Sequence, residues 1–416
     1  MSYTYTDKIK FAYTNNFDAF GRLRVSEPFT LFDSSHRYAD NGLWATQIAT
    51  GGASTFNANE GLIDLSVTAA SGSTVRRETY KVFSYQPGKS LLALNTFVMN
   101  PAKTGLTQRV GYYGAANGLY LQLEGSTLAL VERSSVTGVL VDTRISQFGG
   151  VYGAGDTGWN VDPMDGSGPS GITLDITKAQ ILFMDIEWLG VGSVRCGFVV
   201  NNEFYTCHRF DHANVIASTY ITTASLPLRY EIFNTALTAS PSTLKQICST
   251  VLSEGGYELR GFQQAVVTPI TTPYALTTAG TYYPVISLRL KATRLDAVVV
   301  MSALSIMGVG TGLYNWQVRE SCTTTGGAWV SAGADSAVEY NITGASTSGG
   351  RILATGYLTS TAQAAATTTV LKEALFAFQL ERDYFASDPH ELSVVISAST
   401  NTELVYGAID WEEISR

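Results

Sequence analysis

The chain has 416 residues, of which 45% are hydrophobic, and this composition excludes general disorder. Only 15% of its residues are Asp, Glu, Lys or Arg, against roughly 25% in an average soluble domain, so we expect part of its surface to be covered by neighbouring chains. The net charge of −8 argues against nucleic acid as a partner, because phosphate backbones are bound by basic grooves.

The distribution of apolar residues argues against a membrane location. The longest apolar runs, such as Ala297–Met301, have the length of buried strands, well short of the roughly 18 residues of a membrane helix. The first residues lack the apolar core of a signal peptide. Four cysteines without Cys-x-x-Cys spacing predict neither a zinc site nor a disulfide scaffold. We therefore expect a chain made in the cytoplasm, with reduced thiols.

Residues 1–38 form a distinct first segment, which we interpret as a short N-terminal arm. Arginine and aromatic residues alternate in it, and these are the residue types enriched where protein chains meet. The arm is therefore a candidate assembly segment, and the alternative is that it packs back on its own domain as a first strand. The candidate interface residues are Arg22, Arg24, Phe29, Phe32, Arg37 and Tyr38.

Residues 39–265 show the two-residue alternation of β-strands and predict a β-sandwich domain, which the resemblances given below imply to be concanavalin-like. The clearest hairpin is Gly118–Ser134, in which Gly125-Ser126 separates two alternating runs. A second hairpin, Ser193–Phe210, turns at Asn201-Asn202. That turn would place Cys196 opposite Cys207, as a cross-strand disulfide or as two neighbouring thiols.

A long loop is predicted at Gln147–Gly171, which is rich in Gly, Asp and Pro. Its aspartates Asp156, Asp162 and Asp165 do not have the spacing of a helix-flanked calcium loop, so we interpret them as solvated turn residues. We predict no metal and no cofactor.

Two aromatic residues in this loop, Tyr152 and Trp159, are candidate glycan contacts, because sugar-binding sandwiches place stacking rings near loops. Core packing or subunit contact is the alternative explanation. His208 and His212 have the spacing of two ligands on one helix face, but a hairpin-like segment surrounds them, so we expect no metal there.

The string Phe183–Gly190 is the most enzyme-like part of the chain. It resembles the Glu-x-Asp-x-Glu strand of laminarinase-type glycoside hydrolases, but Phe183 stands where that family has its nucleophile. Hydrolysis with retention of the anomeric configuration requires two carboxyl groups about 5–5.5 Å apart, one of them the nucleophile. The resemblance thus implies a concanavalin-like fold and counts against activity, and we predict that the protein is not an enzyme. Asp185 and Glu187 are expected on the outer face of an amphipathic strand.

Residues 266–416 predict a second β-sandwich or jelly roll, after a Thr- and Pro-rich stretch. The chain is therefore expected to be all-β, with two β-sandwich (jelly-roll-like) domains and a short N-terminal arm. Segment Thr343–Gly350 is interpreted as a small polar connection. The expected strands are Thr281–Leu290, Leu295–Met307, Tyr314–Arg319, Leu371–Leu380, Glu391–Ala398 and Leu404–Trp411.

Both ends of the chain resemble virion structural proteins of tailed bacteriophages, especially cyanophage-like phages of marine and freshwater bacteria. The resemblance rests on FGRLRVSEPFTLFDSSHRY at Phe20–Tyr38 and on YGAIDWEEIS near the C-terminus. Between them, Arg109–Ser134 and Ala179–Phe210 resemble strands of a concanavalin-like or laminin-G-like sandwich.

This resemblance implies a structural component of the virion, in the tail, baseplate, neck or capsid exterior. Such a protein would form a homo-oligomer, a trimer or higher, and would contact other virion proteins. The alternative function is a receptor-binding or adhesion module that recognises a glycan on the host surface.

Overall fold

The computed structural model describes residues 18–19, 21–256, 261–359, 379–383, 385 and 388–415. These residues form strands, turns and loops without an α-helix, which confirms the predicted all-β class with sandwich-like sheets. No described helix could cross a membrane. The chain divides into two compact units, Met1–Glu78 with Tyr85–Tyr257 and Thr79–Ser84 with Glu258–Arg416. The boundary expected near residue 265 falls inside strand β16 (Phe262–Val267), which pairs within the second unit.

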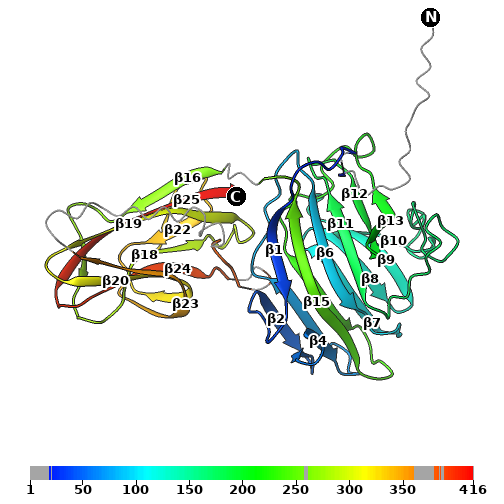
Figure 1. The fold of residues 1–416 in the computed structure, drawn as a ribbon, viewed down its shortest axis with the longest axis horizontal. Coiled ribbons are helices and arrows are strands. Elements are labelled where there is room, and N and C mark those ends of the chain that lie inside the picture. The colour runs from blue at the N-terminus through cyan, green and yellow to red at the C-terminus, as the bar shows by residue number, and fades with distance from the viewer. Residues whose placement is uncertain are drawn as a thin grey trace, which may run out of the picture. The chain divides into compact units, whose positions relative to one another are not determined.

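The first unit contains an eight-stranded antiparallel sheet (Figure 1). The strand order is β13-β12-β11-β6-β15-β4-β3, and β1 pairs with β15 beside β4. The strands are β1 (Phe29–Ser35), β3 (Ala53–Asn57), β4 (Leu62–Val67), β6 (Leu91–Val98), β11 (Gln180–Ile186), β12 (Val194–Val200), β13 (Glu203–Phe210) and β15 (Ser242–Ser253).

A seven-stranded sheet forms the second layer of this unit, in the order β10-β9-β8-β7-β14-β5-β2. Tyr230 of this sheet points toward the eight-stranded sheet and so identifies the inner face. Its hydroxyl bonds to Thr96 O at 3.3 Å and to Ser249 Oγ at 2.9 Å, both in the eight-stranded sheet. Its strands are β2 (Trp44–Ala49), β5 (Thr74–Thr79), β7 (Leu106–Tyr113), β8 (Gly118–Glu124), β9 (Thr127–Ser134), β10 (Val141–Ser146) and β14 (Leu228–Asn234).

The two predicted hairpins of the first unit are confirmed. Strands β8 and β9 flank Gly125-Ser126, and their alternate residues Leu121 and Leu130 are paired and buried on the inner face. Strands β12 and β13 flank Asn201 and Asn202, whose φ angles of 53° and 66° are those of a primed turn. Side-chain alternation and turn chemistry therefore fix these elements locally.

The second unit also consists of two antiparallel sheets. Strand β25 (Glu403–Ser415) pairs with β16, β17 (Tyr274–Leu276) and β19 (Val298–Val309). The six-stranded sheet has the order β21-β22-β18-β24-β20-β23. Its strands are β18 (Tyr283–Leu290), β20 (Leu313–Thr325), β21 (Val330–Ser331), β22 (Val338–Asn341), β23 (Ser346–Thr359) and β24 (Glu391–Ala398).

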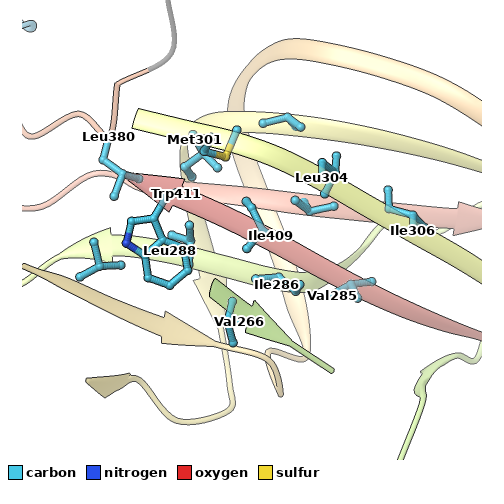
Figure 2. Packing of buried hydrophobic residues seen from close by; sticks show 14 of the residues in the cluster. Val266, Val285, Ile286, Leu288, Met301, Leu304, Ile306, Leu380, Ile409 and Trp411 are labelled. Atoms are coloured by element: carbon cyan, nitrogen blue, oxygen red, sulfur yellow. The ribbon is translucent and has the colours of Figure 1, made fainter. Parts of the chain in front are cut away.

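The core of the second unit lies between these two sheets (Figure 2). Ile409 and Trp411 from β25 pack with Ile286 and Leu288 from β18 and with Leu304 from β19, and all five side chains are buried. Strand β25 is far in sequence from β18 and β19, so the core holds the unit together through long-range contacts.

Two predictions in the second unit, the connection at Thr343–Gly350 and the strand at Leu371–Leu380, were not confirmed. Ser346–Thr359 forms a long strand, although its first residues were expected to be a connection, because Ser, Thr and Gly lack the apolar alternation by which strands are recognised. The strand expected at Leu371–Leu380 lies almost entirely outside the described residues.

Candidate functional site

The described residues of the first unit form a cavity of about 500 Å³ at the edge of the seven-stranded sheet. Edge strand β10 forms one side, and the loop that follows it returns to form the other. The lining residues are Leu140, Asp142, Thr143, Arg144, Tyr152, Gly155 and Asp156.

Strand β10 supplies the charged groups of the cavity through its two-residue alternation. Asp142 and Arg144 lie on the same face, opposite Arg133 and Val131 of β9. Ile145, the next residue of β10, pairs with Leu130 on the inner face and is buried. The strand therefore presents Asp142 and Arg144 outward and covers the core with Ile145, whereas Val141 and Thr143 are exposed at the sheet edge.

The loop after β10 is held in place by the buried carboxylate of Asp156. Asp156 accepts hydrogen bonds from Ser146 N at 2.8 Å, Ser146 Oγ at 2.6 Å, Val151 N at 2.9 Å and Tyr152 N at 3.1 Å. Burial acts to raise the pKa of Asp156, but these donors outweigh it, and the pKa is lowered. Asp156 is therefore an ionised anchor of the loop, and it fixes the backbone of Tyr152 directly.

A glycine is required where this loop folds onto itself. Gly149 has φ 78°, and a Cβ added there would lie 2.9 Å from Gly158 N. A larger residue would therefore push the two parts of the loop apart and displace the side chains that line the cavity.

Tyr152 is the aromatic wall of the cavity. Its half-buried ring packs against the buried cluster of Tyr113, Tyr120, Ala129 and Val131 on the outward face of the sheet. Its hydroxyl donates to Glu124 Oε2 at 3.3 Å, and the pKa of the phenol is raised, first by burial and then by that carboxylate.

The two charged groups of β10 differ in how fully they are bonded. Asp142 accepts from Arg133 Nε at 2.8 Å, from Arg133 Nη2 at 3.0 Å and from Tyr120 Oη at 3.0 Å. Arg144 Nη1 lies 3.6 Å from Glu124 and Arg144 Nη2 lies 3.6 Å from Asp142, while its Nε has no hydrogen-bond partner in the described part of the chain. The unpartnered Nε is buried, so the donors available to a ligand are the two Nη groups of this side chain, which is 31% exposed.

Beyond the cavity, arginines cover the tyrosines of the outward face. The Arg133 guanidinium lies 5.3 Å from the ring centre of Tyr120, and that of Arg229 lies 5.0 Å from the ring centre of Tyr113. Buried Glu231 accepts from Arg109 at 3.3 Å, and its pKa is lowered because this arginine and Arg76 outweigh the effect of burial. These groups bond to one another on the outward face, where the Arg76 side chain is 40% exposed.

The structure separates the two predicted glycan contacts. Tyr152 lies in the cavity, but Trp159 is only 6% exposed and donates from its indole nitrogen to Ile145 O at 3.2 Å. Trp159 also packs near Phe198, with ring centres 6.4 Å apart, so it belongs to the interior, the alternative weighed for these rings. Sequence analysis missed Asp142 and Arg144, although the alternation Val-Asp-Thr-Arg-Ile-Ser in β10 marks both as outward residues.

Of the six arm residues that were candidates for assembly, Arg24 and Phe32 contact their own sheet and the other four are exposed. Strand β1 pairs with β15, and Phe32 is buried with its ring 6.0 Å from that of Trp44. Arg24 binds Asp185 at 2.6 Å, and Arg22 binds Asp18 at 2.6 Å. The exposed residues among the six candidates are Arg22, Phe29, Arg37 and Tyr38.

Asp185 is on the predicted outer face of β11, but it is 2% exposed instead of solvated. Arg24 of the arm and Arg195 of β12 both bind it, and Ser90 Oγ donates to it at 3.1 Å. Burial raises the pKa of nearby Glu187 to about 7, with further contributions from Asp18 and Asp185. This enzyme-like string therefore lies in the eight-stranded sheet, apart from the cavity.

The remaining candidate residues also serve the fold. Asp162 is buried and accepts from Met164 N at 2.7 Å, whereas exposed Asp165 closes a turn on Ser167. Within the described residues, no group of three His, Cys, Asp or Glu residues could hold a metal.

The cysteine pair is shifted from the predicted register. Cys196 pairs with His208, because a bulge leaves Cys207 between paired positions. Both thiols are free and buried, and Cys207 Sγ donates to Cys196 O at 3.3 Å. Burial raises both pKa values, so neither thiol is a ready nucleophile.

No family model and no curated protein matches this chain. Among solved structures, the Emp47p carbohydrate recognition domain is similar, with 12% identity over 55% of this chain and 98% of that chain and a TM-score of 0.32. Peanut lectin with a 9mer peptide has 11% identity, the same coverage and a TM-score of 0.29. A Bacteroides ovatus GH16 protein in complex with a mixed-linkage glucan product has 8% identity over 53% of this chain and 99% of that chain, with a TM-score of 0.35. The function is therefore argued from the residues themselves.

Proposed function

We propose that this protein is a carbohydrate-binding module and that the cavity beside β10 holds one sugar unit. The proposal rests on the juxtaposition of the Tyr152 ring with Arg144 and Asp142 in a cavity of about 500 Å³. A pyranose has an apolar face of C–H groups and a rim of hydroxyls. Tyr152 offers an aromatic surface to the former, beside the Arg144 guanidinium, which lies 5.3 Å from the ring centre. Arg144 offers the latter its two Nη groups, which lie 3.6 Å from the nearest carboxylates and so beyond hydrogen-bond distance of them.

The charges around the cavity favour a neutral sugar. The carboxylates in or beside the cavity are those of Glu124, Asp142 and Asp156, and the guanidiniums bonded to or near them are those of Arg133 and Arg144. An acidic sugar would bring another negative charge to a site that already has an excess of carboxylate, and this repulsion is strong where solvent is partly excluded. Hydroxyls, in contrast, bond to either sign of charge.

Binding without hydrolysis follows from the same groups. A glycoside hydrolase needs a carboxylic acid that keeps its proton near neutral pH, which requires a raised pKa. Two carboxyls that line the cavity, Asp142 and Asp156, have lowered pKa values, because Arg133 acts on the first and hydrogen-bond donors act on the second, in both cases against the effect of burial. Neither can donate a proton to a leaving sugar.

A glycan array of neutral and acidic structures, probed with the full chain, tests the proposal. We expect binding to neutral glycans, a loss of at least about tenfold in affinity for Tyr152→Ala, which corresponds to about 1.4 kcal/mol, and retention for Tyr152→Phe, which keeps the ring. Tyr38→Ala is the matched control, since Tyr38 is 81% exposed and lies outside the cavity lining. The bound glycans should release no reducing sugar. A silent array, or unchanged binding by Tyr152→Ala, would refute the proposal.

The virion role stays a prediction from the sequence, as do the location in a particle, the virion partners and the trimeric or higher assembly. No described contact bears on them.

A further inference from the structure

We infer that the second unit contains a binding site for acidic sugars, in which the guanidinium of Arg319 binds the sugar carboxylate. Arg319 lies on β20 and is half-buried, and its neighbour Val318 is in the core, so Arg319 is on the outward face of the six-stranded sheet. The cavity beside β10 belongs to the other unit. The inference therefore does not rest on the proposed function.

Arg319 differs from other arginines of comparable burial because it has no carboxylate partner. In the described part of the chain, every other buried or half-buried arginine has a carboxylate oxygen within 3.6 Å. Arg319 forms no ion pair with a described residue, and its one hydrogen bond is to a neutral amide. A guanidinium that is partly removed from water without a counter-ion is suited to receive an anion.

Arg289, on β18 of the same sheet, shows which group is missing. Its guanidinium lies 4.2 Å from the ring centre of Trp329, its Nε donates to Glu339 Oε2 at 3.0 Å, and its Nη2 lies 2.9 Å from the same oxygen. Arg319 is also stacked on an aromatic ring, but its chain supplies no carboxylate. The comparison indicates that a ligand carboxylate completes the second arginine.

The Arg319 side chain is held in place by groups that are themselves fully bonded. Its guanidinium lies 4.7 Å from the ring centre of Tyr282, and its Nε donates to Gln317 Oε1 at 2.8 Å. Gln317 Nε2 donates to Tyr282 Oη at 2.9 Å and to Asn315 Oδ1 at 3.3 Å, and Tyr282 Oη donates to Asn315 Oδ1 at 2.6 Å. The two Nη groups are therefore the donors left for a carboxylate, which the planar guanidinium can bind through both.

The surface beside Arg319 has the apolar and hydroxyl groups that suit a sugar chain. Tyr357 is 84% exposed and Ile352 is 51% exposed, and Thr355 between them is exposed. Tyr357 and Arg319 are at opposite ends of this surface, about 13 Å apart along the strands at about 3.3 Å per residue. The pairing of β20 with β23 places six residues in this row, namely Asn315, Gln317, Arg319, Ile352, Thr355 and Tyr357.

Arg319 is the only charged residue of this row, and this argues for an acidic sugar over other acidic ligands. Nucleic acid is bound by grooves with several cations. An extended peptide adds to the edge of a sheet through its main chain and does not need a face. A sugar chain offers one carboxylate to Arg319 and C–H groups to the exposed ring of Tyr357.

An array of glycans that end in uronic or sialic acid, each beside its methyl ester, tests the inference with the full chain. We expect binding to the free acids and loss of binding to the esters, because esterification removes the charge. Arg319→Gln should lose at least about tenfold in affinity for the free acids. The matched control is Arg289→Gln combined with Glu339→Gln, which removes the paired arginine together with its partner and should bind as the wild type does.

A second variant supplies the carboxylate from within the chain. Gln317→Glu would place a carboxylate beside Arg319 Nε, as Glu339 is placed beside Arg289, and should lower the affinity for acidic glycans although Arg319 remains. If circular dichroism shows that Arg319→Gln is unfolded, Gln317→Glu takes its place. Absence of binding to the free acids, equal binding to the methyl esters, or unchanged binding by the folded variant would overturn the inference.

Tyr152→Ala separates this site from the cavity in the first unit. Acidic spots of the array report on Arg319 and neutral spots report on the cavity, so this variant should keep the binding of acidic glycans and lose that of neutral ones. Loss of acidic-glycan binding in Tyr152→Ala would mean that the acidic sugar is bound in the cavity, and would overturn the assignment to Arg319.

Discussion

Two histidines four residues apart, His208 and His212, are both buried, but their pKa values are shifted in opposite directions. Burial lowers the pKa of His208 to about 4, and its Nδ1 accepts a hydrogen bond from Asn160 N at 3.2 Å, which only a neutral ring can do. Burial also acts to lower the pKa of His212, but the hydrogen bond to Glu132 at 2.7 Å outweighs it and raises the pKa. His212 further stacks on Tyr220, with ring centres 4.0 Å apart.

These shifts predict opposite pH dependences of stability. Between about pH 4 and 6.5 the unfolded chain binds a proton at His208 that the folded chain excludes, so this residue makes the protein less stable as the pH falls through that window. His208→Asn keeps a hydrogen-bond acceptor for Asn160 N but does not titrate, so the variant should lose less stability than the wild type as the pH falls from about 6.5 to 4. The contribution of His212 is complete below pH 6.5 and is lost as the pH rises through its raised folded pKa, so His212→Asn should destabilise more at pH 5 than at pH 9.

Urea unfolding across pH 4 to 9 measures both effects as the free energy of unfolding. His36, whose pKa is also lowered to about 4 by burial and by Arg77, remains in the His208→Asn variant. The slope of the free energy of unfolding against pH should therefore become smaller in this variant without reaching zero. Parallel pH profiles for the wild type and both variants would contradict the assigned protonation states.

At the scale of elements, residues Phe29–Ser35 of the predicted arm form β1 and belong to a sheet, whereas residues 1–17 of the arm lie outside the described residues. Alternation gives its two phenylalanines different roles, because Phe32 is 7% exposed and packs on Trp44, whereas Phe29 is 37% exposed. Phe32→Ala should therefore cost about 3–5 kcal/mol of stability, the range for a buried phenylalanine. Phe29→Ala should cost well under half of that, and urea unfolding of the two variants gives the comparison. Equal losses would mean that β1 is not held against β15 as described.

The elements that could be predicted from the sequence are those whose signals are local. The β8–β9 and β12–β13 hairpins are recognisable from Gly125-Ser126 and Asn201-Asn202, which determine the turns. The turn also sets the register throughout β8–β9, but in β12–β13 the bulge at Cys207 shifts it beyond Gly197. Strand β23 was not predicted, because its first residues are Ser, Thr and Gly, which show no apolar alternation. Its backbone pairing with β20 holds these residues in a strand.

The candidate site was predictable only in part, for a similar reason. Tyr152 could be singled out as a loop aromatic, but nothing local distinguishes it from Trp159, which the fold buries. Arg144 and Asp142 become a site only when the loop returns over β10, and that return depends on the bonds of Asp156 to Ser146 and Tyr152. Which ring is buried, and which side chains meet in one cavity, depend on the tertiary structure, so a local sequence pattern predicts them poorly.

At the scale of the whole molecule, each of the two units has a hydrophobic core of its own. Leu121 is fully buried in the first unit, and Leu288 is fully buried in the second among residues from β16, β18, β19 and β25. A unit with its own core can unfold as a cooperative block, so calorimetry should resolve two transitions.

The assignment of each transition follows from one substitution in each core. Leu121→Ala and Leu288→Ala should each cost about 2–5 kcal/mol in their own unit, since the removal of a buried leucine side chain loses its transfer free energy and leaves a cavity. Each variant should therefore lower the midpoint of a different transition and leave the other in place. Leu237→Ala, at a 77% exposed leucine, should move neither, because its side chain is already in water. If both core variants lowered a single common transition, the two cores would unfold as one cooperative body, and a boundary between them would have no thermodynamic meaning.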